Sequence, residues 1–387
     1  MFDTDQKAFR DLLMEIGRER IRDKAARWDR EHEFPWEIHE LLSEQGLYGL
    51  MIPEEYGGLG RSVVDFAIML EALGASSADG ATMGALETSS LGAQPILLAG
   101  DDEQKKRWLP EVASGEALCA FSITEADSGS DASSITSTAV REGDTYRIRA
   151  RKVFCTLGSV ARYITVFAKT SKDDGVRGIS AFVVDTRDAP GFSVGRVEKK
   201  MGLRGNPTVE LNFDGVVVPV ENRLGEEGAG FGIAMQTLAK GRVAVSADSV
   251  GVMQFCMDYA ASYARDRKQF GRPLSDLQAI QFKLADMAIK HETARQATYH
   301  AARVLDDPGS TRSEIGYATA IAKAYSTDVR MEVVSEAIQV LGGYGYMEDH
   351  PLERVFRDSK IYQIFEGTNE IQRIIIGREV AKAGALR

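Results

Sequence analysis

The spacing of apolar residues changes twice along this chain of 387 residues, and these changes limit the folds open to it. Up to about residue 117, apolar stretches without internal glycine or proline, such as Arg61–Leu73, indicate helices. Between about 118 and 225, apolar and polar residues alternate, as in Tyr146–Ala150, which is the two-residue period of a half-buried strand. After the glycine-rich stretch Gly225–Gly232, the spacing returns to the three and four residues of a helix.

These three regions predict an α+β protein with helices at both ends and strands in the middle. The expected domains are an N-terminal α-helical domain (1–117), a middle β domain (118–228) and a C-terminal α-helical domain (229–387). We expect the strands to form a small antiparallel sandwich or barrel-like sheet and the last region to form a four-helix bundle. Further alternating segments predict strands at Ile164–Ala168, Ile179–Val184 and Val209–Phe213.

Charge and cysteine content exclude several classes of protein. The formal charge is −10, from 57 acidic and 47 basic residues, which argues against a general nucleic-acid binder. Three widely spaced cysteines form no C-x-x-C pair, and no apolar run is long enough to cross a bilayer, so membrane insertion is not expected. The amphipathic first helix carries several acids, unlike a transit peptide. We therefore expect a cytoplasmic protein, or the mature form of a mitochondrial matrix protein.

Most familiar catalytic motifs are missing from the sequence. It has no G-x-G-x-x-G, P-loop or H-E-x-x-H, and its histidines follow no metal-ligand pattern, so no metal site is predicted. The segment Gly191-Phe-Ser193-Val-Gly195 matches the nucleophile elbow of hydrolases, but that motif needs a strand-to-helix turn. Here it follows Ala189-Pro190 between strand-like segments, which favours a surface turn. A serine hydrolase that uses Ser193 is kept as an alternative from a different class.

The segment Ile361–Arg373 places a carboxylate, Glu366, after an apolar run and before Gly-Thr-Asn. The small polar residues can cap a helix that starts near Glu370. Burial would raise the pKa of Glu366 and the helix end would lower it, so the net direction is open. Glu366 is equally well interpreted as a catalytic carboxylate or as part of a helix cap.

Three other segments add to this one. Phe121–Asp131 combines turn-forming residues with hydroxyls, and its backbone N–H groups could bind a pyrophosphate, although a solvated loop is the commoner outcome. Arg265–Gly271 and Gln339–Gly345 could each be only a helix end with a glycine cap.

Together, and in this order on an α–β–α chain, the four segments resemble the acyl-CoA dehydrogenase family. The elements T-E-x-x-S-G-S-D, R-x-x-F-G, Q-x-x-G-G-x-G and E-G-T-N-E-I-Q-R are specific as a set, and the resemblance covers nearly the whole chain. It implies a homotetrameric enzyme that uses FAD to desaturate an acyl-CoA between its α and β carbons. It also implies that electrons pass to an electron-transferring flavoprotein.

The resemblance also implies roles for individual residues. Glu366 would be the base that removes the α-proton. The implied FAD contacts are Phe121, Ile123, Thr124, Ser130, Phe154, Thr156, Arg267, Phe270, Gln278, Gln339, Gly342, Gly343, Thr368 and Glu370, some of them reaching a neighbouring subunit. The implied substrate contacts are Ser130, Glu87, Met235, Leu238, Arg242 and Gly367.

The sequence departs from the family pattern in ways that leave the substrate open. Some relatives carry the base where Gly241 stands, which leaves Glu366 as the base here. Ala239 replaces an aspartate that contacts the pantetheine arm, so the thioester carrier could be CoA or a carrier protein. No Lys or Arg occurs from Ser62 to Gln104, which disfavours a second substrate carboxylate. Glu87 could lie at the pocket floor or point to solvent, and an acyl-CoA oxidase that uses oxygen stays an alternative.

Overall fold

The structure is a computed structural model that describes residues 2–172 and 174–382. The N-terminal helices are α1 (Thr4–Ile16), α2 (Ala25–Glu31), α3 (Trp36–Glu44), α4 (Val63–Ser77), α5 (Gly80–Ala99) and α6 (Asp102–Ala113). The central strands are β1 (Cys119–Ser122), β2 (Thr138–Glu142), β3 (Thr145–Thr156), β4 (Tyr163–Lys169), β5 (Ile179–Asp185), β6 (Phe192–Val197), β7 (Thr208–Pro219) and β8 (Arg223–Leu224). The last part comprises α7 (Gly230–Asp266), β9 (Lys268–Gln269), β10 (Arg272–Pro273), α8 (Gln278–Asp306), α9 (Arg312–Leu341), α10 (Leu352–Ser359) and α11 (Asn369–Ala381).

The helices α4 and α5 lie in the middle of the molecule and are buried on nearly all sides. A capping box between Ser62 and Asp65 starts α4, and the side chain of Asp79 caps α5. Both helices are apolar on nearly all faces rather than amphipathic, which is the pattern of a helix that is surrounded by other parts of the protein. The helix α5 is 20 residues long and continues through Pro95.

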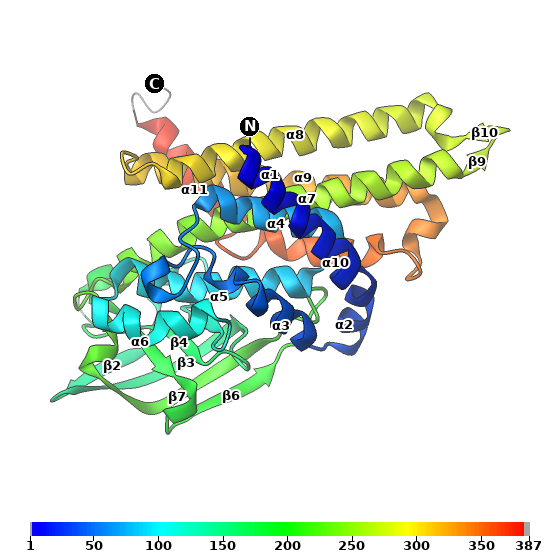
Figure 1. The fold of residues 1–387 in the computed structure, drawn as a ribbon. Coiled ribbons are helices and arrows are strands. Elements are labelled where there is room, and N and C mark those ends of the chain that lie inside the picture. The colour runs from blue at the N-terminus through cyan, green and yellow to red at the C-terminus, as the bar shows by residue number, and fades with distance from the viewer. Residues whose placement is uncertain (1, 173, 383–387) are drawn as a thin grey trace.

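The strands form one twisted sheet below the helices (Figure 1). Its order is β6-β7-β3-β2-β4-β5-β8, with β1 added beside β4, and most of the neighbours are antiparallel. The pairing of β3 with β7 shifts register between Lys152 and Cys155, and Phe154, inside this irregularity, has a φ of 55°. The bulge turns the Phe154 ring out of the sheet, so that its side chain is 65% exposed.

The C-terminal helices α7, α8 and α9 pack side by side, and α4 packs against α7 and α8. The ends of α7 and α8 extend beyond the rest of the protein and are joined by the hairpin β9–β10, at the far right of Figure 1. The predicted fold class, helices on either side of a β domain in sequence, is confirmed. The domain boundaries after residues 117 and 228 stay predictions; they fall between α6 and β1 and between β8 and α7.

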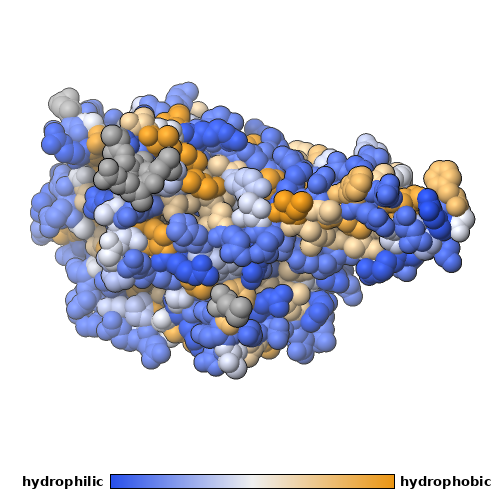
Figure 2. Space-filling model, turned by 90° about the horizontal axis from the view of Figure 1, so that it is seen from above, coloured by the Kyte–Doolittle hydropathy of each residue, from blue (hydrophilic) through white to orange (hydrophobic). Residues whose placement is uncertain are grey.

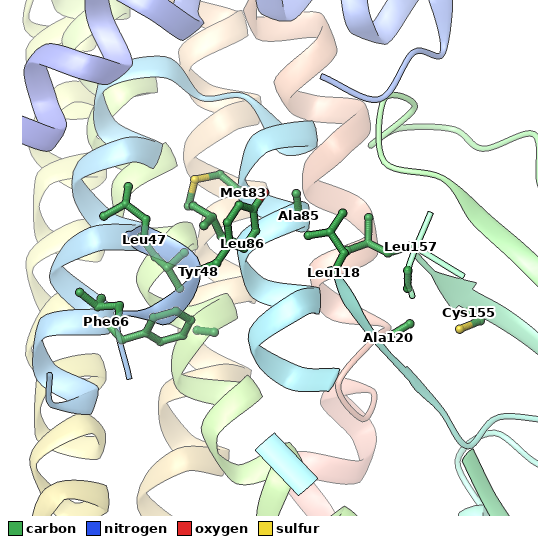
Figure 3. Packing of buried hydrophobic residues seen from close by; sticks show 14 of the residues in the cluster. Leu47, Tyr48, Phe66, Met83, Ala85, Leu86, Leu118, Ala120, Cys155 and Leu157 are labelled. Carbon is green, nitrogen blue, oxygen red and sulfur yellow. The ribbon is translucent and has the colours of Figure 1, made fainter. Parts of the chain in front are cut away.

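One hydrophobic cluster joins the N-terminal helices to the sheet (Figure 3). It runs from Leu47 and Phe66 through Leu86 on α5 to Ala120 on β1 and Leu157 at the end of β3. Apolar burial on this scale holds the two parts as one rigid body, which lets side chains from both form a single site. Among the described residues, no helix is long and apolar enough to span a membrane.

Candidate active site

Glu366 lies in the short link between α10 and α11, and its backbone is left-handed, with a φ of 56°. Thr368, not Glu366, caps α11: its side chain accepts a hydrogen bond from the N–H of Ile371. The sequence left open whether the Glu366 side chain caps this helix, and the structure shows that it does not. A left-handed glutamate is strained by roughly 1–3 kcal/mol, so the surrounding structure must hold it in place.

Two side chains fix this link through its carbonyl groups. Lys323 on α9 donates from Nζ to the Gly367 carbonyl oxygen (2.9 Å) and to Asn369 Oδ1 (2.8 Å). Gln372 on α11 donates from Nε2 to the carbonyls of Gly367 (2.8 Å) and Glu366 (3.3 Å). The base candidate is thus anchored on both sides by groups that are themselves buried.

The carboxylate of Glu366 is in a dry environment. The residue as a whole is partly exposed, but its Oε2 atom is buried and has no hydrogen-bond partner among the described residues. Burial raises the pKa of Glu366 to about 7, while the positive charges of Arg242 and Lys323 work in the opposite direction. A carboxyl group with a pKa near neutrality can accept a proton at physiological pH and is suited to general-base catalysis.

The residue facing this carboxylate is Gly241 on α7. A Cβ atom added there would lie 2.5 Å from Glu366 Oε2, so only glycine leaves the carboxylate its space. Next to it on the same helix, Arg242 is 6% exposed, and its Nε has no hydrogen-bond partner in the described part of the chain. The predicted contacts Met235 and Leu238 are half-buried on α7.

The predicted flavin residues of the β domain lie side by side. Phe121, Ile123 and Thr124 run along the bulged end of β3, and three contacts join the two segments. These are Val153 N–H to the Thr124 carbonyl (3.0 Å), Lys152 Nζ to the Ile123 carbonyl (3.0 Å) and Cys155 Sγ to the Phe121 carbonyl (3.8 Å). Thr124 and Thr156 are half-buried and Ser130 is exposed, so their hydroxyls are accessible.

A buried ion pair supports this part of the site. Lys152 is fully buried, and its Nζ donates to Glu125 Oε1 at 2.8 Å. The carboxylate of Glu125 also accepts hydrogen bonds from the backbone N–H groups of Thr136 and Ser137. Burial works to raise the pKa of Glu125, but Lys152 and these hydrogen bonds lower it to about 2.

The other predicted FAD residues are at the far end of the molecule. Arg267, Gly342 and Gly343 border one surface hollow of about 460 Å³. Phe270, in the β9–β10 hairpin, is 89% exposed, and the nearby Gln278 begins α8, while Gln339 lies in the last turn of α9. In Figure 1 the hairpin is at the opposite end from β2 and β3, so these residues do not reach the β-domain group within one chain. Thr368 and Glu370 begin α11, close to Glu366 in sequence.

Sequence reasoning missed Lys323 and Lys152, because lysines are usually solvated and nothing local marks these two as buried. Each lysine stands within a helix or strand whose neighbouring residues are apolar or alternate in polarity. That position is the only feature of the sequence that indicates burial of these two lysines. Glu87 on α5 is 8% exposed and lines a small cavity that also borders Gly241. The structure therefore places Glu87 toward the interior rather than toward solvent.

Comparisons with known proteins match nearly the whole chain to one protein family. Three family models match in succession: the acyl-CoA dehydrogenase N-terminal domain (residues 3–116), middle domain (residues 120–216) and C-terminal domain (residues 228–381). An acyl-CoA dehydrogenase of Bacillus subtilis is 41% identical over 374 residues, which make up 97% of this chain and 97% of the relative.

Two solved structures are also similar over their full length. Butyryl-CoA dehydrogenase from Megasphaera elsdenii has a TM-score of 0.94 and 38% identity, with 99% of each chain covered. A structure described as the electron transferring flavoprotein of Acidaminococcus fermentans, in connection with flavin-based electron bifurcation, has a TM-score of 0.94 and 40% identity, again with 99% covered.

The chain therefore belongs to the acyl-CoA dehydrogenase family, and the resemblance read from its motifs is confirmed. This defines an FAD-dependent oxidoreductase that dehydrogenates acyl-CoA thioesters. The hydrolase alternative is not favoured. Ser193 lies within strand β6, with no helix after it, so the strand-to-helix turn that a nucleophile elbow needs is missing there.

Proposed function

We propose that the chain desaturates an acyl thioester and that Glu366 is the base that removes its α-proton. The observation that carries this proposal is the buried Oε2 of Glu366, which has no hydrogen-bond partner among residues 2–172 and 174–382, in a carboxyl group whose pKa burial raises to about 7. When bound, FAD supplies the hydride acceptor. The residues of the chain hold the base, exclude water and orient the thioester.

The position of Glu366 suits it to a carbon acid. An α-C–H next to a thioester is weakly acidic, so the base must be desolvated and held within reach of it. The hydrogen bonds from Lys323 and Gln372 fix the backbone on which Glu366 stands, and the glycine at 241 leaves room for its carboxylate. Arg242 and Lys323 place positive charge near the carboxylate, which keeps part of it ionised at neutral pH.

The residues of the β domain fit an FAD. A flavin ring needs a flat apolar face and hydrogen-bonding groups at its edge, and the outward-turned Phe154 with Thr124 and Thr156 supplies both. The adenosine half needs open backbone and cationic groups. Gly342 and Gly343 have no atoms within 4 Å of where a Cβ would stand, and Arg267 borders the same hollow.

Because these two groups lie at opposite ends of one chain, we propose that a second copy completes each FAD site within a homotetramer. The arm that carries the hairpin exposes large apolar side chains, namely Phe270 (89%), Phe282 (65%) and Ile289 (63%), and Figure 2 shows hydrophobic residues along it. Exposed apolar side chains in such number mark an interaction surface.

The partners that we propose follow from the similar proteins. Butyryl-CoA dehydrogenase, as a similar structure, favours CoA over a carrier protein as the thioester carrier. The likeness to the Acidaminococcus structure supports an electron-transferring flavoprotein as the acceptor. Peroxide formed in a one-to-one ratio with product, without any acceptor protein, would instead support the oxidase alternative.

The test of the base is anaerobic mixing of the purified FAD-bound protein with butyryl-CoA, while the loss of the oxidised flavin spectrum is followed. We expect the wild-type flavin to be reduced and Glu366→Gln to reduce it about 10²–10⁴ times more slowly, with its FAD still bound. Glu332→Gln, which breaks a surface ion pair with Lys290, is the matched control and should behave as wild type. A Glu366→Gln protein that keeps FAD and reduces it at the wild-type rate would refute the assignment.

A further inference from the structure

A small cavity lies between α5 and α7, and Gly241 is part of its wall. Its polar wall consists of Glu87, Ser90 and Gln94 from α5 and Thr237 and Lys240 from α7. We call it the α5–α7 cavity; it is narrow, with a volume of about 10 Å³. The rest of its wall is mostly apolar.

One end of the α5–α7 cavity lies next to Glu366, the proposed base. Gly241 is part of its wall, and a Cβ atom at Gly241 would lie 2.5 Å from Glu366 Oε2. An acyl chain whose α-carbon is next to that carboxylate can therefore continue into the α5–α7 cavity.

The polar wall contains three buried atoms that have no hydrogen-bond partner within the described ranges. They are Glu87 Oε1, Gln94 Nε2 and Thr237 Oγ1, and their residues are 8%, 2% and 0% exposed. Leaving one such group unpaired costs roughly 1–3 kcal/mol, so three around one cavity are hard to explain by packing alone. Unpaired groups that converge on a cavity indicate a ligand that pairs them.

Most of these groups act as hydrogen-bond donors. Lys240 donates from Nζ to Gln94 Oε1 at 3.2 Å, which fixes the amide so that its NH₂ is the free side. Burial and the nearby charge of Asp248 raise the pKa of Glu87 well above its usual value, against the opposing charge of Arg330, which favours the protonated, hydrogen-bond-donating form. The ligand therefore has to bring an acceptor.

We propose that the α5–α7 cavity selects an acyl group that carries a neutral oxygen acceptor, a hydroxyl or a carbonyl, beyond its β-carbon. This rests on the proposed desaturation at Glu366. A plain hydrocarbon chain would leave Gln94 and Thr237 unpaired in a dry site. A distal carboxylate would meet a cation, since α7 supplies Lys240 where α4 and α5 supply none, but its charge would also lie near Glu87 and Glu366.

The experiment compares thioesters in matched pairs by anaerobic flavin reduction of the FAD-bound protein at subsaturating concentration. The pairs are valeryl-CoA with 5-hydroxyvaleryl-CoA and hexanoyl-CoA with 5-oxohexanoyl-CoA, and glutaryl-CoA represents the carboxylate. We expect the oxygenated member of at least one pair to be favoured about tenfold or more, and glutaryl-CoA to be poorer than it. Equal or better reduction by both unsubstituted chains, or a preference for glutaryl-CoA, would overturn the inference. Flavin that no thioester reduces would overturn the proposed function itself.

Two variants connect the preference to the wall. Thr237→Val and Gln94→Leu remove one polar group of the wall each, and each should lower the ratio of the rates for the oxygenated and the unsubstituted chain about tenfold. Thr88→Val makes the same chemical change on α5 at a residue outside the cavity wall and should leave the preference unchanged. If Thr237→Val and Gln94→Leu slow both members of a pair equally, the two residues act only in folding and the inference is wrong.

Discussion

Replacing Lys323 with glutamine removes the positive charge beside the proposed base while it keeps a hydrogen-bond donor for the Gly367 carbonyl. Lys323 Nζ donates to that carbonyl and to Asn369, and its charge lowers the pKa of Glu366, although less than Arg242 does. Lys323 itself is fully buried, and burial lowers its pKa to about 8, so it is charged at pH 7. Its removal therefore raises the pKa of Glu366.

The size of this change follows from the charges involved. A neighbouring cation lowers a carboxyl pKa by about 1–3 units, and Lys323 is the weaker of two, so about one unit is lost with it. With a pKa of about 7, half of Glu366 is ionised at pH 7. At a pKa one unit higher, roughly a tenth is ionised, so flavin reduction at pH 7 should fall about fivefold.

The assay is the rate of anaerobic flavin reduction by butyryl-CoA as a function of pH. The acid limb of the Lys323→Gln profile should move about one unit upward, because the base must be ionised to act, and the rate should approach that of wild type at higher pH. Lys200→Gln is the matched control: Lys200 is half-buried, and desolvation lowers its pKa to about 8, but it donates to Asn206 and Thr208 rather than to the link that carries Glu366. A Lys323→Gln profile with an unmoved limb and uniformly lower rates would refute the electrostatic reasoning.

Two further substitutions test the construction of the site. Gly241→Ala should slow flavin reduction at least tenfold without loss of FAD, because its Cβ would lie 2.5 Å from Glu366 Oε2; a wild-type rate in stopped-flow mixing would contradict this. Lys152→Met leaves the Glu125 carboxylate buried without its cation and should destabilise the protein by about 3–5 kcal/mol in urea unfolding at pH 7, with earlier release of FAD. An unchanged unfolding midpoint would show that the pair is not needed.

The architecture could be predicted from the sequence because periodicity reports burial directly. Each of the four predicted strand segments lies in a strand, from β3 to β7. The helix α5 is not evident from local rules, because Pro95 is a helix breaker by those rules, while burial on nearly all sides stabilises the helix across it. The helix is stabilised by packing against residues that are distant in sequence, and a short stretch of sequence does not reveal such contacts.

The candidate site was only partly predictable. Glu366 and the flavin segments stand out because their residue types are unusual together, but the groups that hold them are ordinary lysines and glutamines in helices. The sequence has no Lys or Arg from residue 62 to 104, but the structure brings Lys240 to the cavity from α7. A contact between helices so distant in sequence depends on how they pack, and composition does not record it.

Gly241 and Glu366 are best understood as one feature. They are far apart in sequence, yet a side chain at 241 would begin 2.5 Å from the carboxylate at 366, so the two positions address the same point in space. Only one of them can carry a base. This explains why relatives can carry the base at the position of Gly241 instead. In this chain, Glu366 requires a glycine at position 241 because a side chain there would occupy the space of its carboxylate. The same small residue opens the way from the base into the α5–α7 cavity, so base position and acyl selectivity depend on one position of α7.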